Sequence, residues 1–210
     1  MVFSKVQLER YADVMVWAME EARRGGKFSK YDTVLLRYDA AAAPLAHVVY
    51  ERLLRARYHA VARVNAPEDF ARSFYTLADD KQLDYVAAGE EELQKELNGL
   101  ISLRAPSDLT ALKSVNPSRI ARAAVARKSL REILDNNEQG GIFSWTLCNY
   151  PTKELAAQAG LSLKEYTAQV VKACFLNDKD PVKKWKEIMA QIADIGAWLS
   201  GLKIEKLHIE

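Results

Sequence analysis

Residues 142–165, IFSWTLCNYPTKELAAQAGLSLKE, decide how the rest of this chain is organised. Residues 142–148 are apolar apart from Ser144 and Thr146, which is typical of a central strand buried on both faces of a sheet. Pro151 cannot donate a hydrogen bond to a strand ladder, so the strand is predicted to end before it. The stretch therefore predicts a core strand that leads directly into helices.

The helices that follow carry their own start and stop signals. Thr152 is a residue type that caps a helix, and Gly160 is the type that closes one. Ser162 and Glu165 have the spacing of a capping box for a second helix. Asp180-Pro181 begins a third, longer helix with an apolar stripe. We therefore expect a helical segment after the strand.

Upstream of this stretch, strands alternate with helices. Short apolar runs predict strands at residues 33–38, 60–64 and 100–103. Asn65 is expected to cap the helix after the second strand, with Phe70, Phe74 and Leu77 facing inward. Alternation of this kind predicts βαβ units and a parallel sheet.

The predicted fold class is therefore α/β, with a mostly parallel sheet of about four strands flanked by helices. A helical C-terminal segment and a terminal strand follow the sheet. In this interpretation, residues 1–150 form the α/β domain and residues 151–202 form a helical segment packed on it. Residues 203–210 form the strand that begins a further domain.

Composition excludes several classes of protein. The 210 residues include 30 Lys and Arg and 28 Asp and Glu, a net charge of +2 that argues against a nucleic-acid or membrane-surface protein. The apolar runs fall far short of the roughly 20 residues of a spanning helix, and the N-terminus has no signal-peptide apolar segment. Cys148 and Cys174 lie in apolar settings and are interpreted as reduced core residues of a cytoplasmic protein.

A search for catalytic motifs is largely negative. No two of His47, His59 and His208 have metal-ligand spacing, and no HExxH or CxxC motif is present. The turn after the first strand, residues 39–43, has no glycine, so a nucleotide cradle there is disfavoured. The acidic run 90–92 fits the positive end of a helix better than a cation site. No residue is assigned a catalytic, cofactor-binding or metal-binding role.

Arg127 is the one unusual position. It falls within a helix predicted over residues 118–134, in the middle of an arc formed by Ile120, Ala123, Ala124, Leu130 and Leu134. Its side chain could snorkel from the edge of that arc or form a buried ion pair. It could instead contact an anion or a carboxylate. Arg127 is therefore the single candidate anion contact of the chain.

A family resemblance rests on residues downstream of the opening strand. The matching positions are Trp145, Pro151-Thr152, Ala156-Ala157, Gly160-Leu161-Ser162, Glu165-Tyr166, Ala173-Cys174, Asp180-Pro181 and Trp185. In this order the chain resembles the thermophilic metallo-aminopeptidase family, the aminopeptidase T and aminopeptidase S group. Residues 8–12, 34–37 and 116–121 follow the family's order more loosely. The chain departs from the family at Arg57-Tyr58, where Ala-Gly is usual, and in the longer turn 24–30.

The resemblance implies a function that this chain does not perform alone. Family members remove N-terminal residues from peptides, use two divalent metal ions (zinc, cobalt or manganese) and form homodimers. Their metal ligands and catalytic tyrosine lie in a second domain, beyond the position that matches the end of this chain. The chain is thus expected to be an N-terminal, non-catalytic domain that helps to wall the substrate cavity, is inactive alone and binds none of these metals.

An alternative interpretation needs no missing domain. The chain would then be a stand-alone binding or scaffold module, in its weaker form one that binds anions through the basic helix 118–134. Residues 113–131 hold six basic residues and no acidic residue, spread around the helix rather than along one track. Neither interpretation includes a nucleic-acid or membrane partner.

Overall fold

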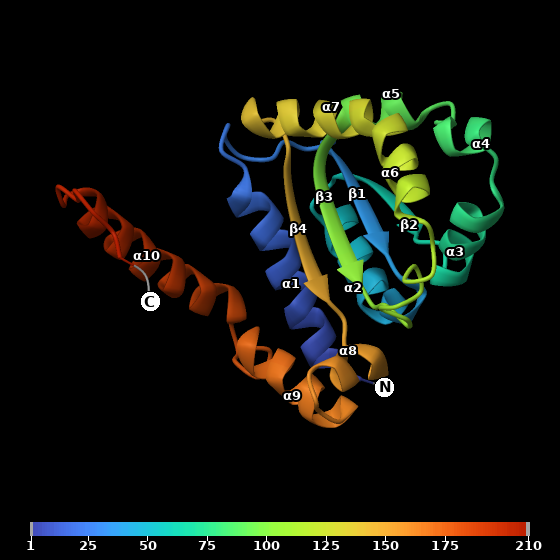
Figure 1. Ribbon diagram of the computed structural model, residues 1–210. Coiled ribbons are helices and arrows are strands. Elements are labelled where there is room, and N and C mark those ends of the chain that lie inside the picture. The colour runs from blue at the N-terminus through green and yellow to red at the C-terminus, as the bar shows by residue number, and fades with distance from the viewer. Residues whose placement is uncertain (1, 209–210) are drawn as a thin grey trace.

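A four-stranded parallel sheet forms the centre of the structure (Figure 1), a computed structural model that describes residues 2–208. The strands lie in the order β2-β1-β3-β4, and each neighbouring pair is parallel. Their bounds are β1 Thr33–Tyr38, β2 His59–Val64, β3 Leu97–Arg104 and β4 Ser144–Asn149. The predicted class, an α/β fold with a parallel sheet of about four strands, is confirmed.

Helices cover the two faces of the sheet unequally. The helices α1 (Lys5–Ala22) and α2 (Ala43–Arg55) pack along the whole of one face. On the other face, α5 (Glu90–Glu96) and α7 (Lys128–Gln139) pack together across the amino ends of the strands (Figure 1). The remaining helices beside the sheet are α3 (Glu68–Leu77), α4 (Asp80–Asp84) and α6 (Pro117–Ala126). The carboxyl-terminal half of the second face is left open.

Alternation along β1 creates two cores. Val34 and Leu36 are buried under α1 and α2, together with Met19 and Leu53. Leu35 points to the opposite face, where the buried residues Leu97 and Phe143 pack with Leu93 and Leu134 of α5 and α7. Because successive strand residues face opposite sides, one apolar strand supports both layers.

The helices after β4 begin where their caps predict. Thr152 accepts a hydrogen bond from the N–H of Leu155 at the start of α8 (Lys153–Gln158). Ser162 and Glu165 form the predicted capping box of α9 (Leu163–Ala173). Asp180 caps α10 (Pro181–Ser200), which extends away from the sheet (Figure 1). No helix in residues 2–208 is long and apolar enough to cross a membrane.

The opening strand is a strand, but it is not a central one. β4 has β3 as its neighbour and occupies the edge of the sheet. Ser144 and Cys148 are buried against α1, whereas Trp145 and Leu147 on the outer face are 46% and 49% exposed. The prediction of burial on both faces is therefore wrong, because an apolar run does not reveal how many layers cover it.

The single helix predicted over 118–134 is also wrong. The chain forms α6 and α7, and Arg127 separates them with φ −99° and ψ 9°. This conformation lies outside the helical region. The break turns the axis of α7 across the sheet, so the helical wheel that placed Arg127 in an apolar arc does not apply.

Two other local predictions differ from the structure. Asn65 does not cap α3, which follows Pro67, and Phe70 and Leu77 are exposed rather than buried. The strand predicted over residues 203–210 does not form over 203–208, where no neighbouring strand is available to pair with it. Residues 209 and 210 lie outside the described part.

Candidate functional site

The carboxyl ends of β1, β2 and β3 meet at Asp39. In this strand order, β2 is added on one side of β1 and β3 on the other, and open α/β sheets bind ligands at such a switch point. Asp39 Oδ1 accepts a hydrogen bond from Asn65 Nδ2 at 2.6 Å, and Asp39 Oδ2 accepts one from the Ala105 N–H at 2.6 Å. Both oxygens of the carboxylate therefore hold the loops after β2 and β3 in place.

The hollow beside Asp39 is acidic. It has a volume of about 280 Å³, and Glu68 and Ser107 line it with Asp39. Burial opposes the charge of Glu68, but hydrogen bonds from the N–H and Oγ of Ser107, each 2.8 Å long, outweigh it and lower the pKa of that carboxyl. Two carboxylates in its lining make this hollow a poor place for a phosphate.

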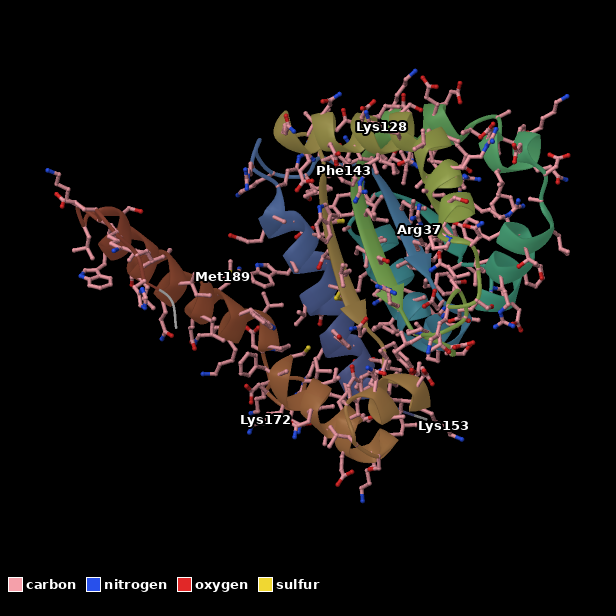
Figure 2. The ribbon with its side chains drawn as sticks, in the orientation of Figure 1. Arg37, Lys128, Phe143, Lys153, Lys172 and Met189 are labelled. Carbon is pink, nitrogen blue, oxygen red and sulfur yellow. The ribbon has the colours of Figure 1, made fainter. Side chains whose placement is uncertain are left out.

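Arginines gather in a second hollow on the open face of the sheet. Its volume is about 510 Å³, and Arg37, Arg127 and Arg131 line it with Glu90. Arg37 projects from β1 on the face opposite α1 and α2 (Figure 2). Glu90 is bound by Arg63, with 2.8 Å between Oε1 and Nη1. The hollow therefore has a net positive charge.

Arg127 uses its guanidinium mainly within the protein. Nη1 donates to the carbonyl oxygen of Ala123 at 2.9 Å, and Nη2 donates to that of Tyr85 at 3.3 Å. The guanidinium carbon also lies 5.6 Å from the centre of the Phe74 ring. Arg127 thus joins the end of α6 to the segment after α4, while it still lines the hollow.

Arg37 and Arg131 are the residues that sequence reasoning missed. Among the described residues, neither has a hydrogen bond or an ion pair. A signal for Arg37 was present, because it is the only charged residue of the strand TVLLRY. The fold was needed to bring that strand residue next to a helix break about 90 positions later.

The two cysteines are free thiols on the α1 side of β4. Cys148 is buried and Cys174 is half-buried, as the interpretation of reduced core residues requires. Burial raises the pKa of the Cys148 thiol to about 12 and also raises the pKa of Cys174. A nucleophilic thiolate is therefore scarce at neutral pH.

The other sequence candidates are dispersed. His47 lies 3.4 Å from Glu51 on the surface of α2, and His59 begins β2 beside the ring of Tyr31. Within the acidic run, Glu91 pairs with Lys95 at 2.7 Å. No group of three or more His, Cys, Asp or Glu side chains in residues 2–208 could hold a metal ion. The residues present do not fit a dinuclear metal centre.

Comparisons with known proteins give one family and one fold. A family model described as thermophilic metalloprotease (M29) matches residues 4–210. The solved structure of wild-type AmpT from Thermus thermophilus is similar, with a TM-score of 0.53 and 22% sequence identity. That similarity covers 80% of this chain and 42% of AmpT, so the chain spans less than half of its relative. The comparison with curated proteins finds no match.

Proposed function

Because this chain belongs to the family of thermophilic metalloproteases (M29), we propose that it is the N-terminal, non-catalytic part of an aminopeptidase. The family match over nearly the whole chain carries the proposal, together with the 42% share of AmpT that the chain spans. The whole enzyme would remove N-terminal residues from peptides with two divalent metal ions, zinc, cobalt or manganese. In this proposal the remainder of the enzyme supplies the reacting groups.

The side chains of this part support that division. A dinuclear site needs several carboxylates and imidazoles that converge on one point. The described residues have carboxylates engaged by arginines and amides, and histidines on separate surfaces. We therefore assign the metals and bond cleavage to the other part of the enzyme.

The contribution of this part would be structural. Residues 1–150 would form the α/β domain and residues 151–202 its packed helical segment. The stretch 203–210 would lead into the catalytic domain. The open face of the sheet and the projecting α10 are surfaces suited to wall a substrate cavity. We also propose a cytoplasmic location, which the two free cysteines support.

The test is an assay of the 210-residue chain with leucine p-nitroanilide and a leucine-containing tripeptide. Zinc, cobalt or manganese is added in excess, and bound metal is measured after dialysis. We expect no release of leucine above the metal-only control and no retained metal. Turnover, or about two metal ions retained per chain, would contradict the placement of the catalytic site.

A second candidate function is anion binding by a stand-alone module, and the arginine hollow supports it. Arg37 and Arg131 are better suited to an anion than Arg127, whose donors face carbonyl oxygens. The probe is inorganic phosphate, titrated calorimetrically. Arg37→Gln should abolish binding, and Arg119→Gln outside the hollow should not. Equal heats for the native chain and Arg37→Gln would remove this function.

A further inference from the structure

The edge of β4 that faces away from β3 has an unused row of backbone groups. The N–H of Tyr150 donates to the carbonyl oxygen of Arg104 at 2.6 Å. The backbone groups of every second residue before Tyr150 in β4 therefore point toward β3. The N–H and C=O groups of Trp145, Leu147 and Asn149 consequently point to the free edge. Within residues 2–208 no hydrogen bond engages them.

An apolar groove of about 530 Å³ runs along this edge. Residues of β4 form its floor, and helices α1 and α10 form its two walls. Met189 of α10 lies on the wall opposite α1 (Figure 2). Among residues 2–208, Glu21 is the only charged residue that lines the groove. The groove therefore favours an apolar ligand that is neutral or basic, rather than an acidic one.

Two tryptophans in the groove lack an acceptor. Trp17 on α1 and Trp185 on α10 both line it, and the Nε1 atom of each is buried without a hydrogen-bond partner among the described residues. A buried donor without an acceptor destabilises the folded state, because it has lost its hydrogen bonds to water. Buried polar groups usually have a hydrogen-bond partner. A ligand that carries hydrogen-bond acceptors would supply one to these two indole N–H groups.

We propose that the groove binds an extended peptide that adds to the free edge of β4 as a fifth strand. The peptide's main chain would pair with the outward groups of Leu147 and Asn149, and one apolar side chain would enter between α1 and α10. The carbonyl oxygens of the peptide are hydrogen-bond acceptors, which the indole N–H groups of Trp17 and Trp185 lack. The inference that this peptide is a substrate of the enzyme rests on the proposed function.

The probe is the capped pentapeptide acetyl-Ala-Val-Leu-Val-Ala-amide, titrated into the metal-free 210-residue chain by calorimetry. The same peptide with an N-methyl group on all five residues keeps no residue N–H with which to pair along the edge, and it should bind at least about tenfold more weakly. A version with glutamate in place of leucine should also bind more weakly, because of Glu21 and the apolar walls. Equal affinity for the methylated peptide, or no heat at roughly 1 mM peptide, would overturn the proposal.

Leu147→Pro is the matching protein variant. It removes an outward N–H, and proline is tolerated on the solvent side of an edge strand. We expect it to weaken binding at least about tenfold, whereas Leu147→Ala, which keeps the N–H, retains binding. If Leu147→Pro does not fold, slower hydrogen exchange at the Leu147 amide of the native chain on addition of peptide replaces this arm. Unchanged exchange contradicts the proposal.

A second copy of the chain is the competing occupant. Conversion of a dimer into a monomer by Leu147→Pro, in sedimentation velocity without peptide, would assign the edge to that copy and overturn the peptide proposal. Failure of the proposed function can be distinguished from failure of this proposal. The proposed function fails if the chain shows turnover or retains metal, whereas peptide affinity is measured with the metal-free chain and without turnover.

Discussion

Charged residues at the end of β1 and at the junction of α6 and α7 use their charge inside the protein. Asp39 binds a side-chain amide and a backbone N–H, and Arg127 binds two backbone carbonyl oxygens. Such bonds offset the cost of leaving buried backbone groups unpaired. At the scale of single residues, an unusual polar side chain in this chain more often closes a loop than forms a reactive centre.

The cysteines should be slow to react in the native protein. Burial raises the pKa of Cys148 to about 12, so its thiolate fraction at pH 8 is on the order of one in ten thousand. A thiol reagent such as dithionitrobenzoate should modify Cys148 at least about a hundredfold faster in guanidinium than in buffer. Cys174→Ser isolates Cys148 for this measurement. Equal rates in the two conditions would contradict the burial of this thiol.

Gly25 and Gly141 form a close backbone crossing between α1 and β4. The Gly25 N–H bonds to the Gly141 carbonyl oxygen at 3.1 Å, and a Cβ on Gly25 would lie 2.4 Å from that oxygen. Gly25→Ala should therefore lower the free energy of unfolding by about 1–3 kcal/mol, measured by urea denaturation.

Gly196 in α10 provides the control for that substitution. A Cβ there meets no atom within 4 Å, so Gly196→Ala should leave stability unchanged or raise it by about 0.5–1 kcal/mol. A Gly25→Ala variant as stable as the native chain would show that the crossing adjusts without cost.

At the scale of elements, local signals were sufficient for helix starts and insufficient for position in the sheet. Thr152, Ser162 and Asp180 all accept the capping hydrogen bonds that their spacing predicts. Capping depends on residues three or fewer positions away, which any short window contains. The predicted fold class followed from these starts and from the alternation of strands with helices.

Long-range contacts decided what the sequence pattern could not. β4 is apolar because α1 buries one face of it, and its edge position depends on strand order. Asn65 has the residue type of a cap but instead binds Asp39, which is 26 positions earlier. At the helix break, Arg127 donates a hydrogen bond to the carbonyl oxygen of Tyr85, which is 42 positions earlier, and lines the hollow with Arg37 and Arg131. Of the three arginines that line the hollow, the sequence therefore indicated Arg127 and not Arg37 or Arg131.

The link between α4 and α6 should weaken in acid. Arg122 Nε and Nη2 donate to both oxygens of Asp84, at 2.8 and 2.6 Å, and these bonds lower the pKa of Asp84 below its ordinary value of 3.8. A carboxyl whose pKa is lowered by folding contributes stability above pH 3.8, and that contribution is lost as the pH falls through the folded-state pKa. Carboxyl titration by NMR should give a midpoint for Asp84 below 3.8.

Arg122→Gln tests the cause of that shift. It should return the Asp84 midpoint toward 3.8 and speed hydrogen exchange in α4, whereas Arg131→Gln, outside this link, should change neither. A midpoint that does not respond to Arg122→Gln would show that another group holds the charge of Asp84.

At the scale of the whole molecule, the described chain leaves two large surfaces uncovered. One is the carboxyl-terminal half of the outer sheet face, where Leu147 of β4 is exposed. The other is α10, whose exposed apolar residues include Ile192, Ile195 and Trp198. Contiguous exposed apolar residues are typical of interaction surfaces. A chain that spans 42% of AmpT is expected to have such surfaces where other parts of an enzyme would pack.

We expect the 210-residue chain to form a homodimer through α10, since apolar helix faces of this kind are buried by association. Sedimentation velocity should give about twice the monomer mass. The double variant Ile195→Lys and Trp198→Lys should sediment as a monomer with unchanged helical content, because lysine removes apolar area without breaking the helix. Val125→Lys, a change at an exposed apolar residue on α6, should leave the dimer intact. A monomeric native chain would contradict this dimer.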